Sequence, residues 1–187
     1  MTNLRTILLT GISAVIATAG VAYANPTVGG AAMFESKNII ENAVKSPVHK
    51  TLVAAVQAAG LVDVLQTAGP FTVFAPVDKA FAKLPAGTVE TLLKQENKAT
   101  LVKVLTAHVV AGDLTSAVLK KRIKANGGSY NMKTVSGDTI TAKMSGKSIM
   151  IFDESGGSAT ITTADVNQSN GEIHVINRVL IPGTRAH

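Results

Sequence analysis

The stretch Gly69-Pro-Phe-Thr-Val-Phe-Ala-Pro-Val-Asp-Lys-Ala-Phe81 places a short strand directly before a short helix. Residues 71–75 form an apolar run rich in strand-favouring Phe, Thr and Val. Pro76 ends the strand's ladder because it has no N–H to donate. Asp78 is predicted to cap a brief helix that continues to Leu84. This stretch therefore predicts a buried strand that leads directly into a capped helix.

Around this stretch, apolar residues recur every three to four positions, as in amphipathic helices. Ser36 is predicted to cap a first short helix. Ser46-Pro47 is predicted to end that helix and begin the next, because Ser is a favoured N-cap and Pro fits the first helical position. Gly60 is placed to close the second helix in the left-handed conformation, and Asn97 is expected to cap a later one. The predicted helical segments are 36–44, 47–59, 61–65, 78–84, 88–94, 97–108 and 114–121.

After Asn126-Gly127-Gly128 the hydrophobic period changes from 3.6 to 2, which indicates strands. Between them lie Ser-Gly, Ser-Gly-Gly and Asn-Gly breaks, which favour hairpin turns between antiparallel neighbours. The predicted strands are 130–135, 139–144, 148–152, 159–163 and 173–181. Helices in the first half and mainly antiparallel strands in the second half predict an α+β fold.

The predicted core consists of the apolar helix faces and the most apolar strands. It comprises Leu52, Val56, Leu65, Phe71, Val73, Phe74, Phe81, Leu84, Leu92, Leu101, Val104, Leu105, Ile173, Val175, Val179 and Leu180.

The two ends of the chain differ in composition from this domain. Arg5 and an apolar stretch from Thr6 to Val21 precede Ala22-Tyr23-Ala24, a pattern typical of a cleavable signal peptide. The alternative is an uncleaved N-terminal anchor. We expect a signal peptide at 1–24, a flexible lead-in at 25–35, the domain at 36–182 and a polar tail at 183–187. The product is predicted to be exported, to the periplasm or outside the cell, and not to span the membrane.

Composition limits the classes of partner. Without residues 1–24 the chain has 17 Lys and Arg against 12 Asp and Glu, a net charge of +5, which favours anionic partners. Nucleic acid is not an expected partner, because the chain has no Trp and keeps only Tyr130 and five Phe for base stacking. There is no cysteine, so the fold depends on packing rather than on disulfides.

The densest group of charges is Lys120, Lys121, Arg122 and Lys124. These cations stand where a helix is predicted to end, so one interpretation is that they complement the helix dipole. The other is that they form a docking patch for an anionic surface polymer. Both interpretations stay open at this stage.

No catalytic or metal-binding pattern is complete. A Gly-x-Ser-x-Gly elbow is missing. Gly146-Lys147-Ser148 resembles the end of a phosphate loop, but Thr141 stands where the leading Gly should be and strands flank the segment. The four histidines, His49, His108, His174 and His187, show no ligand spacing typical of zinc. Asp153-Glu154 is expected to be a solvated hairpin tip rather than a weak cation site. We therefore predict no catalytic residue, no metal and no cofactor, and a protein that is not an enzyme.

His108 lies one helical turn beyond Val104 and two turns beyond Leu101, on the predicted apolar face. A buried imidazole needs hydrogen-bond partners for its ring nitrogens. We predict a buried structural histidine that is bonded to a neighbouring segment, and the alternative is a ligand contact.

Three segments together resemble the fasciclin domain family. They are the stretch 69–81, the segment Leu105-Thr-Ala-His-Val-Val-Ala-Gly112, and Asn170-Gly-Glu-Ile-His-Val-Ile-Asn-Arg-Val-Leu-Ile-Pro182, which Thr163-Ala-Asp-Val166 precedes. The resemblance covers about residues 36–182. Where the family usually has Tyr before the central His, this chain has Ala107, and where it often has Asp, this chain has Asn177.

The resemblance implies a fold and a class of function. The fold is a wedge of two β-sheets with helices packed over one side. The function is non-enzymatic adhesion or cell-surface binding, here to a protein or an anionic polysaccharide of the cell envelope or matrix. An integrin partner is not carried over, because Ala107 alters the segment implicated in animal members. Some members bind apolar small molecules, including carotenoids, between sheet and helices, which is the alternative function.

Overall fold

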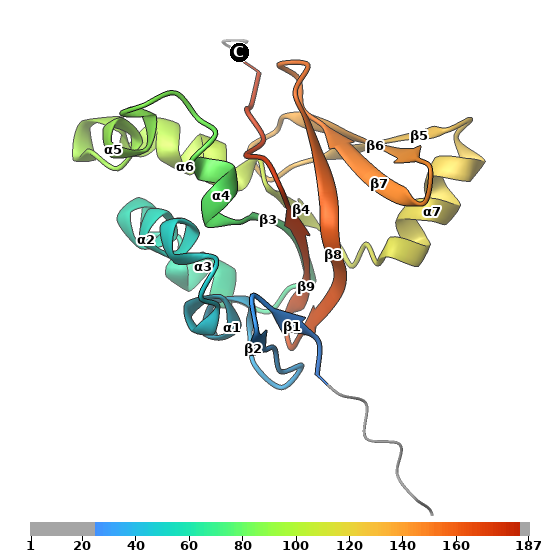
Figure 1. The fold of residues 1–187 in the computed structure, drawn as a ribbon, viewed down its shortest axis with the longest axis horizontal. Coiled ribbons are helices and arrows are strands. Elements are labelled where there is room, and N and C mark those ends of the chain that lie inside the picture. The colour runs from blue at the N-terminus through green and yellow to red at the C-terminus, as the bar shows by residue number, and fades with distance from the viewer. Residues whose placement is uncertain (1–24, 184–187) are drawn as a thin grey trace, which may run out of the picture.

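The strand predicted from residues 71–75 lies inside the sheet. The computed structural model describes residues 25–183, and β3 spans Phe71–Pro76. It pairs antiparallel with β4 (Val109–Ala111) and parallel with β9 (Gly171–Ile176). An early segment and the last strand of the chain therefore lie side by side (Figure 1).

β8 (Ser158–Gln168) joins the two halves of the sheet. Its C-terminal part pairs with β9, and its N-terminal part pairs with β7 (Ser148–Phe152). β6 (Thr139–Ser145) and β5 (Ser129–Lys133) complete the order β4-β3-β9-β8-β7-β6-β5.

The β8–β9 ladder is interrupted by two register shifts between Ile161 and Val166. Bulges of this kind bend a strand and increase its twist. The two halves of the sheet diverge from β8 (Figure 1). Helices packed on a mainly antiparallel sheet confirm the predicted α+β class.

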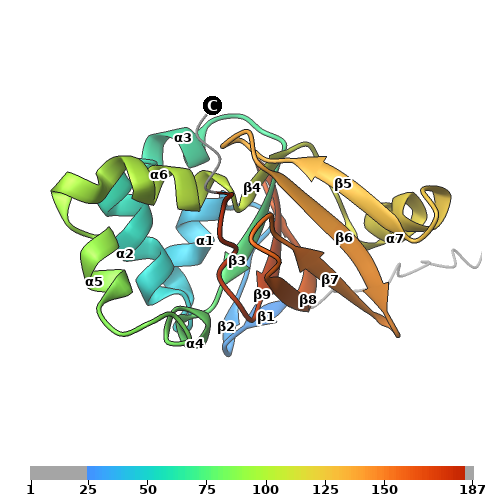
Figure 2. The same cartoon turned by 90° about the horizontal axis from the view of Figure 1, so that it is seen from above.

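The helices lie at opposite ends of this sheet. α1 to α6 gather on one side of β3, whereas α7 (Ser116–Ala125) packs against β5 and β6 (Figures 1 and 2). The first group consists of α1 (Ile39–Lys45), α2 (Lys50–Ala59), α3 (Val62–Gln66), α4 (Asp78–Phe81), α5 (Thr88–Leu92) and α6 (Lys98–Thr106), with a 3-10 turn at Gln95–Asn97. Within residues 25–183, no helix has the length and hydrophobicity needed to cross a membrane.

Two of the predicted helix starts are wrong. Asn38, not Ser36, caps α1, because its side chain accepts from the N–H of Glu41 while the Glu41 carboxylate accepts from the N–H of Asn38. Ser46 ends α1 instead of capping α2, and α2 begins at Lys50. Gly60 closes α2 with a φ of 72°, as predicted.

Asp78 caps a different helix from the one expected. Its carboxylate accepts from the backbone N–H of Thr51 at 2.8 Å and of Lys50 at 3.4 Å, the first turn of α2. These hydrogen bonds outweigh the effect of burial and hold the pKa of Asp78 below its usual value. Asp78 thus fastens α2 to the segment that follows β3, a tertiary contact that local spacing does not reveal.

The buried side chains form two clusters. The first lies between α1–α6 and the β3–β9 pair and includes Leu52, Val56, Leu101 and Ile173. Twelve of the sixteen predicted core residues are buried, and Phe71, Leu84, Leu92 and Val104 are half-buried.

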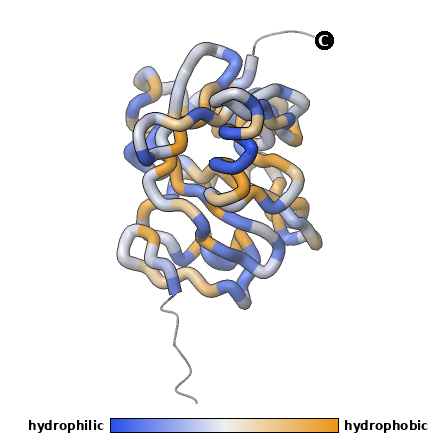
Figure 3. The backbone as a smooth tube through the Cα atoms, turned by 90° about the vertical axis from the view of Figure 1, so that its right-hand side faces the viewer, coloured by the Kyte–Doolittle hydropathy of each residue, from blue (hydrophilic) through white to orange (hydrophobic). Residues whose placement is uncertain are grey.

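The second cluster lies under α7 and was mostly missed. It includes Leu119, Ile123, Ile140 and Ile151, each no more than 2% exposed. Hydrophobic and hydrophilic stretches alternate along the chain in Figure 3, as expected where each element buries one face.

The predicted flexible lead-in is wrong for residues 27–33. β1 (Thr27–Val28) and β2 (Ala31–Ala32) form a small hairpin, and Val28 and Met33 are buried in the first cluster. Burial of these two apolar side chains favours packing of the hairpin against the domain. The predicted signal peptide and most of the predicted tail, with His187, lie outside the described residues.

Candidate functional site

His108 lies just past the end of α6, two residues after Thr106. Its Nδ1–H donates to the carbonyl of Val104 at 2.8 Å, and its Nε2 accepts from the N–H of Leu180 at 2.8 Å. The side chain is buried, which lowers the pKa of His108 to about 4 even though the Val104 carbonyl and Asp153 act in the opposite direction. The imidazole is therefore neutral, and it ties α6 to the segment after β9.

An apolar pocket lies near His108, between α1, α2, α3 and the strands β3 and β4. Its cavity volume is about 90 Å³, and Lys, Arg, Asp and Glu do not occur among its lining residues. Val44, Val64 and Val135 line it and are 53%, 48% and 50% exposed. Exposed valines beside an apolar cavity are a feature of binding sites rather than of closed cores.

The predicted cationic cluster lies on the outer face of α7. Leu119 and Ile123 point into the second core cluster, while Lys120, Lys121, Arg122 and Lys124 are all exposed. We call these four residues the basic surface. The Arg122 guanidinium lies 5.2 Å from the Tyr130 ring centre and donates to the Tyr130 hydroxyl. Within residues 25–183, none of the four takes part in an ion pair.

The segment 115–160, which contains α7 and the strands β5 to β7, is mostly positive, whereas the acid Asp165 lies at the first residue of α7. Residues 115–160 contain seven Lys and Arg but only Asp138, Asp153 and Glu154 as acids. Asp138 and Asp153 are buried, and Glu154 accepts a hydrogen bond from the N–H of Thr139. The charges that this region presents to solvent are therefore nearly all cationic.

The expected solvated hairpin tip at Asp153-Glu154 is corrected by the structure. Asp153 is only 8% exposed. Its carboxylate accepts from the Ser155 hydroxyl, the Gly157 N–H and the Ile181 N–H. Asp153 thus anchors the segment after β9 to the β7–β8 turn. Gly146-Lys147-Ser148 joins β6 to β7, a strand-to-strand turn rather than a phosphate loop.

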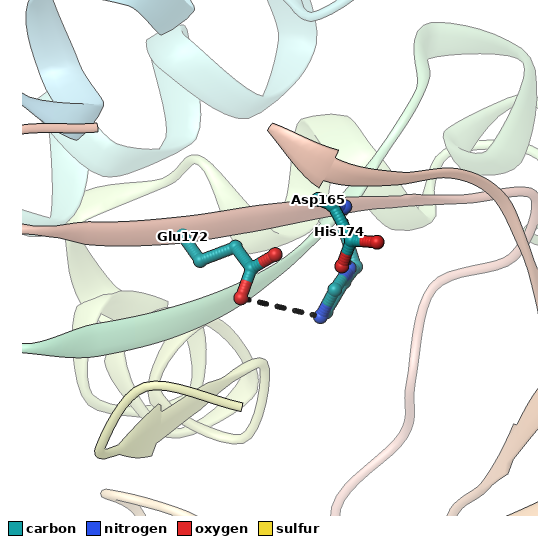
Figure 4. Close-up of side chains that lie close together, drawn as sticks. All are labelled: Asp165, Glu172 and His174. Atoms are coloured by element: carbon teal, nitrogen blue, oxygen red, sulfur yellow. Dashed lines mark hydrogen bonds and ion pairs between the residues drawn. The ribbon is translucent and has the colours of Figure 1, made fainter. Parts of the chain in front are cut away.

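An acidic cluster that the sequence analysis missed lies where β8 bulges against β9. Asp165, Glu172 and His174 converge, with one potential ligand atom of each within 4.8 Å of the others (Figure 4). Glu172 is 1% exposed, and neither of its carboxyl oxygens has a hydrogen-bond partner in the described part of the chain. One Glu172 oxygen lies 4.0 Å from His174 Nε2.

The environment assigns a charge state to each group. Burial, together with the neighbouring Asp165 and Asp113, raises the pKa of Glu172 to about 9, so this carboxyl group is neutral at pH 7. Burial also lowers the pKa of His174, which stays neutral. For Asp165, two hydrogen bonds from Ser116 overcome the effect of burial and hold the pKa below its usual value.

Few ligand atoms of this cluster are free to bind a metal ion. His174 Nε2–H donates to the Leu114 carbonyl at 2.8 Å, and Nδ1 accepts from the Asp165 N–H at 3.3 Å. Both Asp165 oxygens accept from Ser116, each at 2.6 Å. A protein metal site needs three or four available ligands, and here only the Glu172 carboxyl is unengaged. The arrangement fits a protonated Glu172 that lies beside the start of α7.

The comparisons with known proteins agree with this fold. The sequence model of the Fasciclin domain matches residues 47–182. The chain is 44% identical to Protein sll1483 of Synechocystis over 83% of this chain and 79% of that one. It is 33% identical to the immunogenic protein MPB70 of Mycobacterium bovis over 86% of this chain and 78% of that one.

Among solved structures, the FAS1 domain pair of the insect cell adhesion molecule Fasciclin I matches with a TM-score of 0.53 and 21% identity. The match covers 70% of this chain and 44% of that one, and it supports the fold alone. With a family match over more than half of its length and relatives above 30% identity, the chain belongs to the fasciclin domain family.

Proposed function

We propose that this protein is an exported, non-enzymatic interaction module. Its partner is a protein or an anionic polysaccharide of the cell envelope or matrix, and it binds this partner through the basic surface of α7. The observation that supports this most directly is four adjacent exposed cations on one helix, without ion pairs in the described part of the chain. Export is supported by the signal-peptide pattern of residues 1–24.

The packing beneath α7 supports the same proposal. Leu119 and Ile123 are 0% and 1% exposed, so the helix is fixed on β5 and β6 by a filled core. Cations on a fixed helix lose little conformational freedom when they meet an anionic polymer, compared with cations on a loop. The surrounding positive charge adds long-range attraction that salt weakens.

The test is retention on an immobilised sulfated polysaccharide over a salt gradient. The variant Lys120→Gln/Lys121→Gln/Lys124→Gln removes three cations and keeps the Arg122–Tyr130 contact. Its control is Lys79→Gln/Lys94→Gln/Lys98→Gln, which removes the same charge from exposed positions among α4 to α6. We expect the α7 variant to elute at clearly lower salt than the control. Equal elution of the two variants would mean that net charge, not the basic surface, governs binding.

The apolar pocket favours a second function, the binding of an apolar small molecule. The lining without charged residues and the exposed Val44, Val64 and Val135 support it. A cavity of about 90 Å³ is smaller than the roughly 150 Å³ that holds one benzene. An elongated ligand such as a carotenoid would therefore have to lie partly along these valines, or the helices would have to move apart.

This second function is tested on protein purified from its native host. Absorbance in the visible range and mass spectrometry of an organic-solvent extract would reveal a bound apolar compound. The variant Val44→Gln/Val135→Gln changes the rim alone and should lower the amount extracted. A colourless protein with an empty extract would exclude this function and leave the basic surface as the binding site.

A further inference from the structure

The chain contains two Asn-Gly pairs, Asn126-Gly127 and Asn170-Gly171. The contacts and the free space around the two pairs differ strongly in the structure. Asn-Gly is the dipeptide in which a side-chain amide is most open to attack by the next backbone nitrogen, because glycine has no side chain to hinder the approach. Whether the reaction occurs in a folded protein depends on how freely the pair can move. The two pairs therefore form a comparison within one molecule.

Asn126 stands at the exposed end of α7. Its side chain makes one hydrogen bond, from Nδ2 to the Arg122 carbonyl at 2.7 Å. Gly127 and Gly128 follow with φ of 70° and 99°, and the Gly127 N–H makes no hydrogen bond within residues 25–183. A Cβ added at either glycine would meet nothing within 4 Å. The pair thus has an unengaged nucleophile and open space in which to rotate.

Asn170 is held on every side. Its side-chain oxygen accepts from the Ile39 N–H at 3.0 Å, and its Nδ2 donates to the carbonyls of Leu65 and Thr67. Its own carbonyl accepts from the Phe71 N–H at 3.1 Å. Gly171 is in β9, where an added Cβ would lie 2.0 Å from the Phe71 carbonyl oxygen. The five-membered ring of the reaction has no room here.

We propose that Asn126 is a site of spontaneous deamidation, which places a carboxylate beside the basic surface as the protein ages. The Gly127 nitrogen attacks Asn126 Cγ, a C–N bond forms, and the Cγ–Nδ2 bond breaks. Nδ2 leaves as ammonia with the proton lost from Gly127. Water then opens the resulting succinimide and yields aspartate or isoaspartate. Asn170 must first break three side-chain hydrogen bonds, so its rate should be lower by about 100-fold.

The new carboxylate changes two properties of α7. It stands at the helix C-terminus, where a negative charge is unfavourable, so the melting temperature should fall by about 1–3 °C. It also offsets one of the four cations of the basic surface. This second consequence rests on the proposed function, whereas the deamidation itself does not.

The experiment is incubation of the purified protein at neutral and mildly alkaline pH, followed by tryptic peptide mapping. Asn126 falls in the peptide 125–133 and Asn170 in the peptide 148–178, so the two sites are read separately. A synthetic peptide of residues 125–133 gives the rate for an unrestrained chain. Asn126→Gln is the variant that keeps an amide, and Asn126→Asp reproduces the product's charge.

We expect acid to accumulate at Asn126, none at Asn170 over the same period, and no acidic form of Asn126→Gln at this site. The proposal is overturned if the folded protein keeps Asn126 intact while the peptide has fully reacted, or if Asn170 reacts as fast. If Asn126 deamidates but Asn126→Asp binds the sulfated polysaccharide as before, the proposed deamidation site is supported. The proposed binding through the basic surface is then contradicted.

Discussion

The two core clusters of the domain are packed to different degrees. The cluster under α7 is closed, with Leu119, Ile151 and Ile176 at 0% exposure. The cluster under α1–α6 is surrounded by half-buried side chains and leaves the apolar cavity, with Val44 and Val64 exposed beside it. A filled core holds a surface in one geometry, whereas an incompletely filled core leaves room for a guest. The domain thus has a rigid charged end and an open apolar end.

The largest expected effect tests this difference on a single strand. Both phenylalanines line the pocket, but Phe74 is fully buried in the second cluster beside His174, with ring centres 5.6 Å apart, whereas Phe71 is half-buried. Phe74→Ala should lower the free energy of unfolding by about 3–5 kcal/mol. Phe71→Ala should cost clearly less, because a half-buried side chain has less apolar surface removed from water. Denaturant unfolding measures both, and equal losses would contradict the difference in packing.

The next effect concerns Glu172, a buried carboxyl group without a hydrogen-bond partner in the described residues. Its pKa is raised to about 9 from 4.5, so the folded state keeps a proton that the unfolded chain releases above pH 4.5. The stability that this proton brings is complete below pH 4.5 and is lost as the pH rises towards 9. At pH 7 the loss amounts to about 3 kcal/mol.

Glu172→Gln removes this dependence and should raise the stability at pH 7 by up to that amount. The measurement is urea unfolding between pH 4 and 9, with the exposed Glu96→Gln as control. Glu96→Gln should follow the parent curve. A Glu172→Gln curve that falls with pH as steeply as the parent's would show that Glu172 is ionised in the folded protein.

His108 gives a smaller effect. His108→Ala leaves the Leu180 N–H without its acceptor and should cost about 1–3 kcal/mol. The pKa of His108 is lowered from 6.5 to about 4, so its contribution to stability is lost as the pH falls from 6.5 to 4. The variant should therefore lose less stability than the parent over that range. Its retention on sulfated polysaccharide should be unchanged, and a folded variant that no longer binds would place His108 in the binding site.

The core residues at one end of the domain could be predicted from the sequence better than those at the other end. The cluster under α1–α6 was predicted because its helices carry a 3.6-residue period and β3 is a continuous apolar run. In the other half the strands were found, but Ile140 and Ile151 were not recognised as core. A short strand with alternating residues has two faces, and its own sequence does not show which face is buried. Here the buried face is the one that packs against α7, which is a separate segment of the chain.

The candidate sites could likewise be predicted only where their residues lie on a single helix or strand. The basic surface could be predicted because its four residues lie within five positions of one helix. Glu172 and His174 share a face of one strand, and an acid in an otherwise apolar strand was a readable signal. Asp165 could not be placed with them, because it reaches them only through the bulge in β8. The N-cap role of Asp78 on α2 was hidden for the same reason, since it depends on a contact between separate segments.

The smallest effect on stability separates the two interpretations of the α7 cations. Lys124 lies in the last turn, where a positive charge complements the helix dipole, whereas Lys120 lies nearer the middle of the helix. Lys124→Gln should lower the free energy of unfolding by about 0.3–1 kcal/mol, and Lys120→Gln should leave it nearly unchanged. Because a polyanion is attracted to both cations, the two variants should lose similar retention on sulfated polysaccharide. Thermal unfolding and the salt gradient on the same preparations give both readings. If retention falls only for Lys124→Gln, in parallel with stability, the cations complement the helix and the polymer binds elsewhere.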